Sequence, residues 1–439
     1  MSTKMKESTK KYLTERIQNR SFSFGVIGLG YVGLPLAVEF AKQGVRTTGF
    51  DIDESKVENI GRGKSYIQDV KSQDLSDLSE HLTASTNMSG LADMDVISIC
   101  VPTPLNKTKD PNMSYVFSAI QSVKQTLRPG QLIILESTTY PGTTEELLKP
   151  ILEETGLVIG EDVFLAFSPE RVDPGNTKYH TVNTPKVIGG STESCTDLAK
   201  LTYEVVINTV VPVSSTSTAE LVKLYENMFR AVNIALANEM AIMCNKLGVS
   251  VWEVIEAAAT KPFGFMPFYP GPGLGGHCIP IDPHYLSWKM KTLNYDAKFI
   301  GLAAEVNQSM PGYVVERVTG LLNDRKKAVN GSKITVMGVA YKQNINDSRE
   351  SPAIEIISGL KKRGAEVQYH DSYIPQCKIQ GETFSSVPCT PDLLASSDLV
   401  LILAAHDTVD WDAVLAHSTC ILDTRNCLGQ ASDDKVNRL

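Results

Sequence analysis

A single cysteine, Cys278, lies in a segment rich in glycine and proline, Gly273–Pro283. Gly275 and the other small residues before it would let a substrate approach the sulfur closely, and Asp282 follows four residues later. A cysteine thiolate at such a site could attack a substrate carbon, and the carboxylate could bind the same water or hydroxyl group. A buried, inert cysteine is the alternative.

Polar side chains with helical spacing precede this segment. Lys223 and Asn227 are four residues apart in a predicted helix, so they lie on one face, with Glu220 one turn earlier. A lysine and an asparagine that point into a cleft could stabilise an oxyanion or transfer a proton. The spacing is equally compatible with a solvated pair between Glu220 and Lys223.

A glycine-rich run, Gly28-Leu29-Gly30-Tyr31-Val32-Gly33, follows a predicted strand and opens a predicted helix. In this context Gly28 permits a tight turn, Gly30 lets the backbone approach a pyrophosphate, and Gly33 lets the helix pack on the strand. The pyrophosphate would bind N–H groups at the helix N-terminus. The whole run, Tyr31 and Val32 included, therefore predicts a dinucleotide site.

An acidic residue, Asp51, ends the second predicted strand, about 20 positions after the glycines. A carboxylate there accepts hydrogen bonds from ribose hydroxyls and would repel a 2′-phosphate, so the predicted cofactor is NAD rather than NADP. Lys56 is the nearest cation on the following segment. It either contacts the same ribose or is a solvated residue on a helix surface.

Two later strands end in polar turns, one with Pro102 and Thr103 and the other with Thr138. Ligands of open α/β sheets collect at the carboxyl ends of strands, so both turns could face the nicotinamide. Ordinary turn and N-cap chemistry is the alternative.

Two regions of alternating strand and helix patterns must position these residues. Strands are predicted at Phe22–Ile27, Thr47–Phe50, Val96–Val101, Leu132–Leu135, Val163–Phe167, Lys333–Val339, Glu366–His370, Leu399–Ala404 and Cys420–Leu422. Most are far enough apart for a crossover helix, which predicts doubly wound parallel sheets. Between the regions, Thr218–Leu247 predicts one long helix, whereas Lys261–Pro283 predicts a structured loop.

Composition excludes several classes of function. The chain has 42 Lys+Arg against 50 Asp+Glu, hence a charge of −8 and no general basic surface for nucleic acid. No apolar run approaches the ~20 residues of a membrane helix, and Met1–Arg20 lacks the apolar region of a secretory signal. Eight scattered cysteines without zinc spacing indicate a reducing cytoplasm and no metal site.

Over nearly its whole length, the chain resembles the UDP-glucose/GDP-mannose dehydrogenase family. The resemblance rests on the glycine-rich run and on Val101–Pro104, Ser168–Glu170, Glu220–Asn227, Gly275–Cys278 with Asp282, and Gly338–Lys342 followed by Asp347–Arg349. It implies an N-terminal domain that binds NAD, central helices that join subunits into a homo-oligomer, and a C-terminal domain that holds the nucleotide of a UDP-sugar.

The expected fold is therefore α/β, with two Rossmann-like doubly wound domains joined by a long central helix and a helical dimerisation domain. The expected division is an N-terminal extension (1–20), a NAD-binding Rossmann domain (21–213), a central helical domain with the cysteine loop (214–315), and a Rossmann-like domain that binds the UDP-sugar (330–439).

The resemblance also implies a reaction that needs a cysteine. One hydride transfer turns the C6 alcohol of the sugar into an aldehyde, and attack by Cys278 gives a thiohemiacetal that can lose a second hydride. The resulting thioester is cleaved by water, which completes a four-electron oxidation to the uronic acid for a surface polysaccharide. Lys223 and Asn227 would stabilise the oxyanion, and Asp282 with a water would help to deprotonate the alcohol.

The remaining roles come from the same resemblance. Thr138 would orient water beside the cofactor, Glu170 would be the base for thioester hydrolysis, and Arg349 would contact the diphosphate of a bound cofactor or substrate. Substrate contacts are implied for Glu170, Arg171, Lys223, Asn227, Gly275 and Lys342.

Departures from the family pattern narrow the substrate. Oxidisers of UDP-glucose often have a second acid where this chain has Pro174, so Arg171 or Asp173 would have to replace it. His277 and Ile281 stand where those enzymes have Ser and Lys. These changes resemble the branch that acts on UDP-N-acetylhexosamines, with UDP-N-acetylglucosamine the expected substrate.

Other functions are compatible with part of the pattern. UDP-N-acetylgalactosamine, UDP-N-acetylmannosamine and UDP-glucose are alternative substrates. A hydroxyacid-type dehydrogenase that makes one oxidation would share the first domain, but it would need neither Cys278 nor the second α/β region. A protein that only senses NAD or a nucleotide sugar would bind without turnover.

Overall fold

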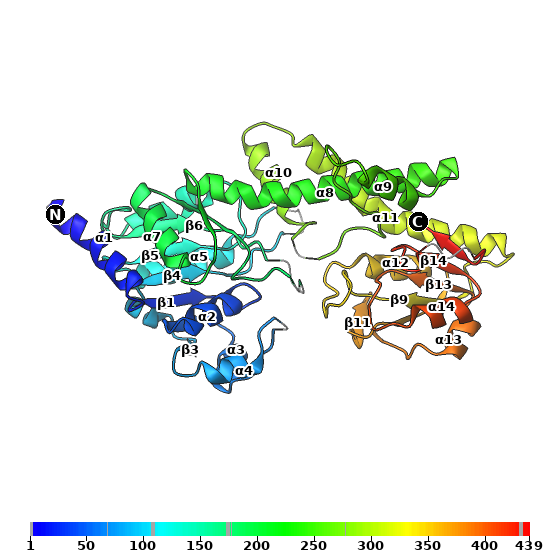
Figure 1. Ribbon diagram of the computed structural model, residues 1–439, viewed down its shortest axis with the longest axis horizontal. Coiled ribbons are helices and arrows are strands. Elements are labelled where there is room, and N and C mark those ends of the chain that lie inside the picture. Colours follow the sequence, from blue (N-terminus) through cyan, green and yellow to red (C-terminus); the bar gives the residue numbers. More distant parts are fainter. Residues whose placement is uncertain are drawn as a thin grey trace. The chain divides into compact units, whose positions relative to one another are not determined.

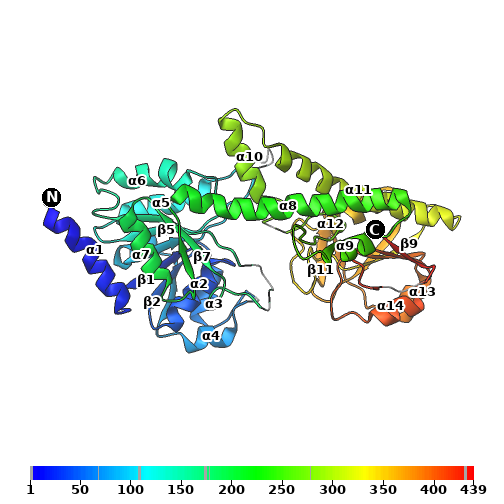
Figure 2. The same cartoon turned by 45° about the horizontal axis from the view of Figure 1, so that its top comes forward.

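The computed structural model describes residues 3–67, 69–106, 110–172, 176, 178–276, 278–429 and 433–439. The chain divides into two compact units, Met1–Glu226 with His284–Tyr295, and Asn227–Pro283 with Asp296–Leu439. Figures 1 and 2 label the elements of both units. The division into four segments expected from the sequence stays a prediction.

A sheet with the strand order β3-β2-β1-β4-β5-β6-β7-β8 forms the centre of the first unit. Its neighbours pair in parallel except β6 and β7. The strands are β1 (Ser23–Ile27), β2 (Arg46–Phe50), β3 (Leu82–Ser85), β4 (Val96–Ile99), β5 (Leu132–Leu135), β6 (Phe164–Phe167), β7 (Lys186–Gly190) and β8 (Val210–Pro212). The strand order reverses between β1 and β4, which is where such sheets bind dinucleotides.

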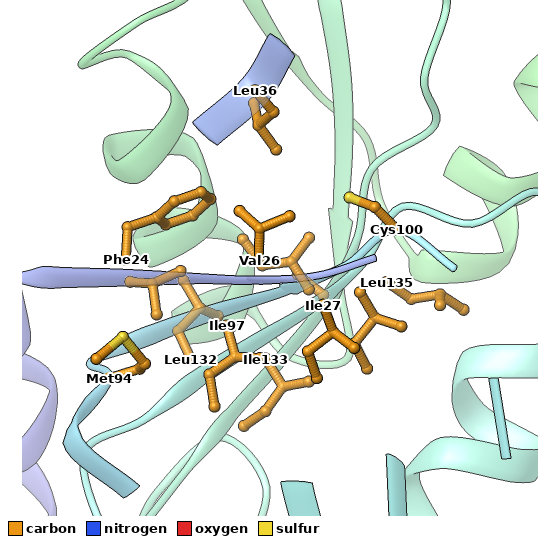
Figure 3. Close-up of a cluster of buried hydrophobic side chains, with 14 of the residues drawn as sticks. Phe24, Val26, Ile27, Leu36, Met94, Ile97, Cys100, Leu132, Ile133 and Leu135 are labelled. Carbon is orange, nitrogen blue, oxygen red and sulfur yellow. The ribbon is translucent and has the colours of Figure 1, made fainter. Parts of the chain in front are cut away.

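Helices cover both faces of this sheet, so every residue of its central strands β1, β4 and β5 is buried. Figure 3 shows Phe24 and Val26 of β1 on the side of Leu36 of α2, and Ile27 of β1, Ile97 of β4 and Ile133 of β5 on the other side. All of them belong to one buried cluster. The helical elements are α1 (Thr3–Gln18), α2 (Gly33–Lys42), α3 (Glu54–Gly61), α4 (Ser72–Asp77), η1 (Met88–Asp93), α5 (Ser114–Thr126), η2 (Thr144–Leu148), α6 (Lys149–Glu153) and α7 (Glu193–Tyr203).

The N-terminal extension forms α1, which lies beside α7 in both views (Figures 1 and 2). Leu13 and Ile17 of α1 are buried in the core of the first unit. The extension is therefore packed on the domain rather than solvated along its whole surface.

A second sheet, with the order β10-β9-β13-β14-β15, is parallel throughout. Its strands are β9 (Lys333–Met337), β10 (Glu366–His370), β13 (Leu399–Ile402), β14 (Ile421–Asp423) and β15 (Val436–Arg438), and a separate hairpin contains β11 (Gln376–Ile379) and β12 (Glu382–Ser385). With α12 (Pro352–Lys362), α13 (Pro391–Ser396) and α14 (Trp411–His417), this region is a second Rossmann-like fold. Both doubly wound sheets confirm the predicted fold class.

The remaining helices are α8 (Thr216–Leu247), α9 (Val251–Ala259), α10 (Asp282–Thr292) and α11 (Lys298–Asp324). The predicted long helix is confirmed as α8, which begins in the first unit and continues into the second. In the second unit, Asn238 of α8 donates to Asn307 Oδ1 of α11 (2.9 Å) and accepts from Gly271 N (2.9 Å). This buried contact fixes one end of the loop that leads to Cys278.

Candidate active site

The glycine-rich turn joins β1 to α2. Gly28 has a φ of 95°, which favours glycine, and its N–H donates to Phe50 O (2.7 Å). A Cβ on Gly33 would lie 1.9 Å from the Gly28 oxygen, whereas a Cβ on Gly30 would meet nothing within 4 Å. No side chain caps the N-terminus of α2. Gly30 thus leaves space for a pyrophosphate, and the N-terminus of α2 provides N–H groups that can bind it.

Asp51 follows β2 and is buried. Its Oδ2 accepts from Leu29 N and from Lys56 Nζ, both at 2.8 Å, and its Oδ1 accepts from Asp53 N at 3.0 Å. A carboxylate has about four acceptor positions, so these three donors leave capacity for a ribose hydroxyl. Lys56 is bound to Asp51 itself, and Tyr31 is half-exposed on the turn above. The residues present therefore fit NAD.

The turns after β4 and β5 are bonded to each other and to α10. Ser137 Oγ donates to the carbonyl of Val101 (2.7 Å), directly before Pro102 and Thr103. Tyr285 OH of α10 donates to Thr103 O (2.5 Å). These contacts fix the two turns that the sequence assigns to the cofactor.

Glu220 and Lys223 of α8 both contact the turn after β5. Lys223 Nζ donates to Thr138 Oγ1 (2.5 Å), which brings two predicted site residues together. Glu220 accepts from Gly142 N (2.6 Å), Thr144 N (2.9 Å) and Thr144 Oγ1 (2.7 Å). Burial raises the pKa of Glu220 although these donors oppose the shift. The alternative of a solvated pair between Glu220 and Lys223 is excluded, because Glu220 is 1% exposed.

Glu170 follows β6 in the same unit. Its Oε1 accepts from Arg171 N and Val172 N, each at 2.7 Å, and its Oε2 lies 3.6 Å from Lys186 Nζ. Burial alone would raise the pKa of Glu170, but Lys186 and the two N–H groups hold it below its usual value. Glu170 is therefore a carboxylate at neutral pH, although its basicity is lower than that of a general base tuned near pH 7.

Arg171 is engaged by the protein itself. Its guanidinium donates to both oxygens of Glu226 on α8 (2.5 and 3.1 Å) and to Pro185 O (2.7 Å). This arrangement ties the segment after β6 to α8. Asp173 and Pro174, where the second acid is missing, lie outside the described residues.

In the second unit, Cys278 is exposed on the turn that leads into α10. Its carbonyl accepts from Ile281 N (3.1 Å) and Asp282 N (2.8 Å), so this turn has helical geometry. Asp282 is buried, and its Oδ2 accepts from Asn227 Nδ2 (2.7 Å). Asn227 and Asp282, predicted separately, thus lie together one turn from the cysteine. The exposure of Cys278 excludes the buried, inert alternative, whereas His277 lies outside the described residues.

The segment before the cysteine packs on a loop that carries two further predicted residues. A Cβ on Gly275 would lie 2.6 Å from Tyr341 Cβ, which requires glycine. Lys342 follows Tyr341 directly, so it lies on the loop that this segment contacts. On the same loop, Arg349 Nη2 donates to Asp347 Oδ2 (2.7 Å).

Several buried charged groups were missed from the sequence, among them a lysine and an aspartate. The lysine is the Lys186 that faces Glu170. The aspartate is Asp371 after β10, whose Oδ2 accepts from Val339 N (2.8 Å) and Ala340 N (3.0 Å) and lies 3.1 Å from His406 Nε2. Its Oδ1 accepts from two more backbone N–H groups. Burial opposes the shift, but His406 and the N–H groups lower the pKa of Asp371. The position of Asp371, after the second strand of its fold like Asp51, was the available signal.

Across the described ranges, no helix is both long enough and apolar enough to cross a bilayer. Within the same ranges, no group of three or more His, Cys, Asp or Glu side chains could hold a metal ion.

Comparison with known proteins decides the family. Models of three domains of the UDP-glucose/GDP-mannose dehydrogenase family match this chain. The NAD binding domain matches residues 23–207, the central domain residues 217–309, and the UDP binding domain residues 335–430. The chain belongs to the UDP-glucose/GDP-mannose dehydrogenase family. It is an NAD-dependent nucleotide-sugar 6-dehydrogenase.

Related enzymes have names that specify two different hexosamines. A UDP-N-acetyl-D-glucosamine 6-dehydrogenase of Pseudomonas aeruginosa is 35% identical, over 88% of this chain and 91% of its own. A UDP-N-acetyl-D-mannosamine dehydrogenase of Methanocaldococcus jannaschii is 37% identical, over 92% of both chains. A solved UDP-D-ManNAc dehydrogenase of Pyrococcus horikoshii superposes with a TM-score of 0.86 at 32% identity, over 95% of this chain and 98% of that one.

Proposed function

We propose that this dehydrogenase oxidises the C6 alcohol of a UDP-N-acetylhexosamine to the carboxylate, with Cys278 as the covalent nucleophile. The observation that carries the proposal is the turn at Cys278, where an exposed thiol stands one helical turn from the buried Asp282–Asn227 contact. An exposed thiol is accessible to a carbon atom of a bound substrate.

Each of these side chains would have a separate role in the reaction. Asp282, held by Asn227, assists removal of the alcohol proton, and Lys223 and Asn227 stabilise the oxyanion. The glycine-rich turn would hold NAD, which would supply the hydride acceptor for both oxidations. Between the oxidations the Cys278 sulfur bonds to the aldehyde carbon, giving a thiohemiacetal and then a thioester. Water attacks the thioester, the carbon–sulfur bond breaks, and the carboxylate and the thiol are released.

Hydrolysis would depend on the groups around Thr138 and Glu170. Thr138 orients the water, and Glu170, ionised at neutral pH, accepts its proton. Lys342 contacts the sugar nucleotide, and Arg349 contacts a diphosphate.

Two hexosamines are candidates for the substrate. UDP-N-acetylglucosamine is our expectation from the sequence, supported by the name of the Pseudomonas relative. UDP-N-acetylmannosamine, its epimer at C2, is supported by the names of the archaeal relative and of the solved structure with a TM-score of 0.86. The product would serve surface polysaccharide synthesis in the cytoplasm, and that location stays a prediction.

A homo-oligomer through the central helices is part of the proposal. Large apolar side chains are exposed there, among them Phe229 (41%), Leu236 (56%) and Met243 (41%) of α8, and Phe299 (67%) and Leu302 (58%) of α11. Such a set of exposed apolar groups is typical of a protein interface. Light scattering of the purified chain tests this, because a monomer at micromolar concentration would contradict it.

An NADH-release assay tests the function. We expect two NADH per sugar consumed and turnover with one of the two epimers, with UDP-N-acetylgalactosamine and UDP-glucose as comparison substrates. One NADH per sugar would refute the thioester route and favour a single oxidation. Binding of NAD and nucleotide sugar without turnover would instead indicate a sensor.

A further inference from the structure

Three buried charged side chains form a row in the first unit. Lys186, at the start of β7, lies between Glu136, directly after β5, and Glu170, after β6. Its Nζ is 2.7 Å from Glu136 Oε2 and 3.6 Å from Glu170 Oε2. The side chains of Lys186, Glu136 and Glu170 are 5%, 0% and 13% exposed. One cation therefore lies near two carboxylates, and Glu170 is the most exposed of the three side chains.

The inner end of the row is fully hydrogen-bonded. Glu136 Oε1 accepts from Ser98 Oγ (2.8 Å) and from the hydroxyl of Tyr203, while its Oε2 takes Lys186. The Lys186 Nζ also lies 5.0 Å from the Tyr203 ring centroid. A buried ion pair is rarely more stabilising than apolar side chains of equal volume. Stability of the sheet therefore does not by itself explain this pair.

The segment that carries Lys186 is bonded to the segment that carries Glu170. Two bonds hold the segments together, because Ser168 Oγ donates to Val187 O (2.9 Å) and Arg171 donates to Pro185 O (2.7 Å). The Glu170 carboxylate is thus fixed at Oε1 by backbone N–H groups and at Oε2 by Lys186. Burial lowers and the two carboxylates raise the pKa of Lys186, and the net shift is upward, so it remains a cation.

We propose that Lys186 is a positioning residue, which keeps Glu170 in its carboxylate form and orientation, and that Glu136 holds Lys186 in place. This inference rests on the proposed role of Glu170 in thioester hydrolysis. The charged and titratable groups that face Glu170 are Lys186 from β7, Lys223 from α8, and Cys100 after β4. Lys186 Nζ lies 3.6 Å from Glu170 Oε2, and its effect on the Glu170 carboxylate is larger than that of Lys223.

Replacement of Lys186 by methionine is the direct test. An opposite charge at this distance lowers a carboxyl pKa by about 1–3 units, so its loss should move the acid limb of the hydrolysis pH profile upward by at least about one unit. NAD affinity should stay within about twofold, because Asp51 and the glycine-rich turn are untouched. Lys186→Arg should restore the acid limb, since it keeps the cation.

Two further variants distinguish loss of the positioning role from misfolding of the protein. Lys186→Met leaves the Glu136 charge buried without a cation, so the double variant Lys186→Met/Glu136→Gln should fold better and keep the raised acid limb. Glu136→Gln keeps a side-chain oxygen that can accept from Lys186 and removes only the competing charge, so Lys186 stays beside Glu170 and the acid limb should not rise. Arg128→Met is the matched control, because it removes a cation from the buried Asp95 (3.0 Å) elsewhere in this unit and should not move the profile.

Glu170→Gln separates this inference from the proposed function. Mass spectrometry of that variant should detect an acyl group on Cys278, and its absence would refute the role of Glu170 itself. If the acyl group accumulates but the acid limbs of both Lys186→Met variants match that of the wild type, the positioning role of Lys186 is refuted.

Discussion

Replacing Glu220 by alanine tests how the turn that carries Thr138 is held. The carboxylate is 1% exposed and receives Gly142 N, Thr144 N and Thr144 Oγ1 at 2.6 to 2.9 Å. The hydroxyl can rotate to another acceptor, but the two backbone N–H groups cannot. Each buried N–H left without a partner costs about 1–3 kcal/mol.

The expected loss is smaller than the sum of these costs. Burial raises the pKa of Glu220, so alanine also removes a carboxylate that is costly to bury. We therefore expect a net loss of about 3 kcal/mol in the free energy of unfolding of the first unit. Glu204→Ala is the control, because Glu204 forms an exposed pair with Lys200 (2.6 Å) whose loss costs ~0.2–1 kcal/mol.

Tryptophan fluorescence can follow this unit separately. Trp288 packs on Tyr140 of the same turn, with 4.9 Å between ring centroids. The other two tryptophans, Trp252 and Trp411, belong to the second unit and can be replaced by phenylalanine. In that background, urea unfolding and NADH release are measured together. A Glu220→Ala variant no less stable than Glu204→Ala, with unchanged Trp288 emission, would refute the reasoning.

Three further predictions concern the cofactor turn, the nucleophile and the second fold. Cys278→Ser should lose at least about a thousandfold in acid formation while its NAD affinity stays within twofold by calorimetry; unchanged acid formation would remove Cys278 from the mechanism. Gly30→Ala should fold normally but bind NAD poorly, whereas Gly33→Ala should lower the melting temperature, because its Cβ would lie 1.9 Å from a carbonyl oxygen; equal melting temperatures would contradict this. The folded-state pKa of Asp371 is lowered, so its stabilisation is present above the unfolded value of about 3.9 and is lost as the pH falls through the folded value. Asp371→Asn should therefore be less stable than wild type at pH 7 and lose less stability on acidification, and identical acid transitions in circular dichroism would refute this.

The features predicted from sequence are those that depend on neighbouring residues. The glycine-rich run and Asp51 lie within one strand-turn-helix-strand unit, so their spacing fixes their geometry. Two strands, Leu132–Leu135 and Glu366–His370, have the predicted bounds, because both are short apolar or β-prone runs with clear ends. The long helix was recognisable because no Pro or Gly interrupts α8.

Other features depend on contacts between distant segments. Glu220 bonds to residues 76 and 78 positions away, and nothing in the helical spacing indicates that partner. Lys186 begins a buried strand, where a charged side chain needs partners of opposite charge. Those partners, Glu136 and Glu170, follow other strands, so the sequence around Lys186 does not indicate them. Helix α11 contains Pro311, a residue that normally ends a helix, and was not predicted. Short edge strands such as β8 and β15 have too few residues for a periodic signal.

The carboxylates after β2 and β10 occupy equivalent places in the two Rossmann-like folds, but their acceptor capacity differs. Asp51 receives three donors, whereas Asp371 receives four backbone N–H groups and lies against His406. The second carboxylate is saturated by its own chain and has no lone pair left for a ribose. The same position therefore carries, in the first fold, a carboxylate with room for a further donor and, in the second, a carboxylate that braces its own chain. Two folds of similar topology thus differ in what their equivalent acids have left to offer a ligand.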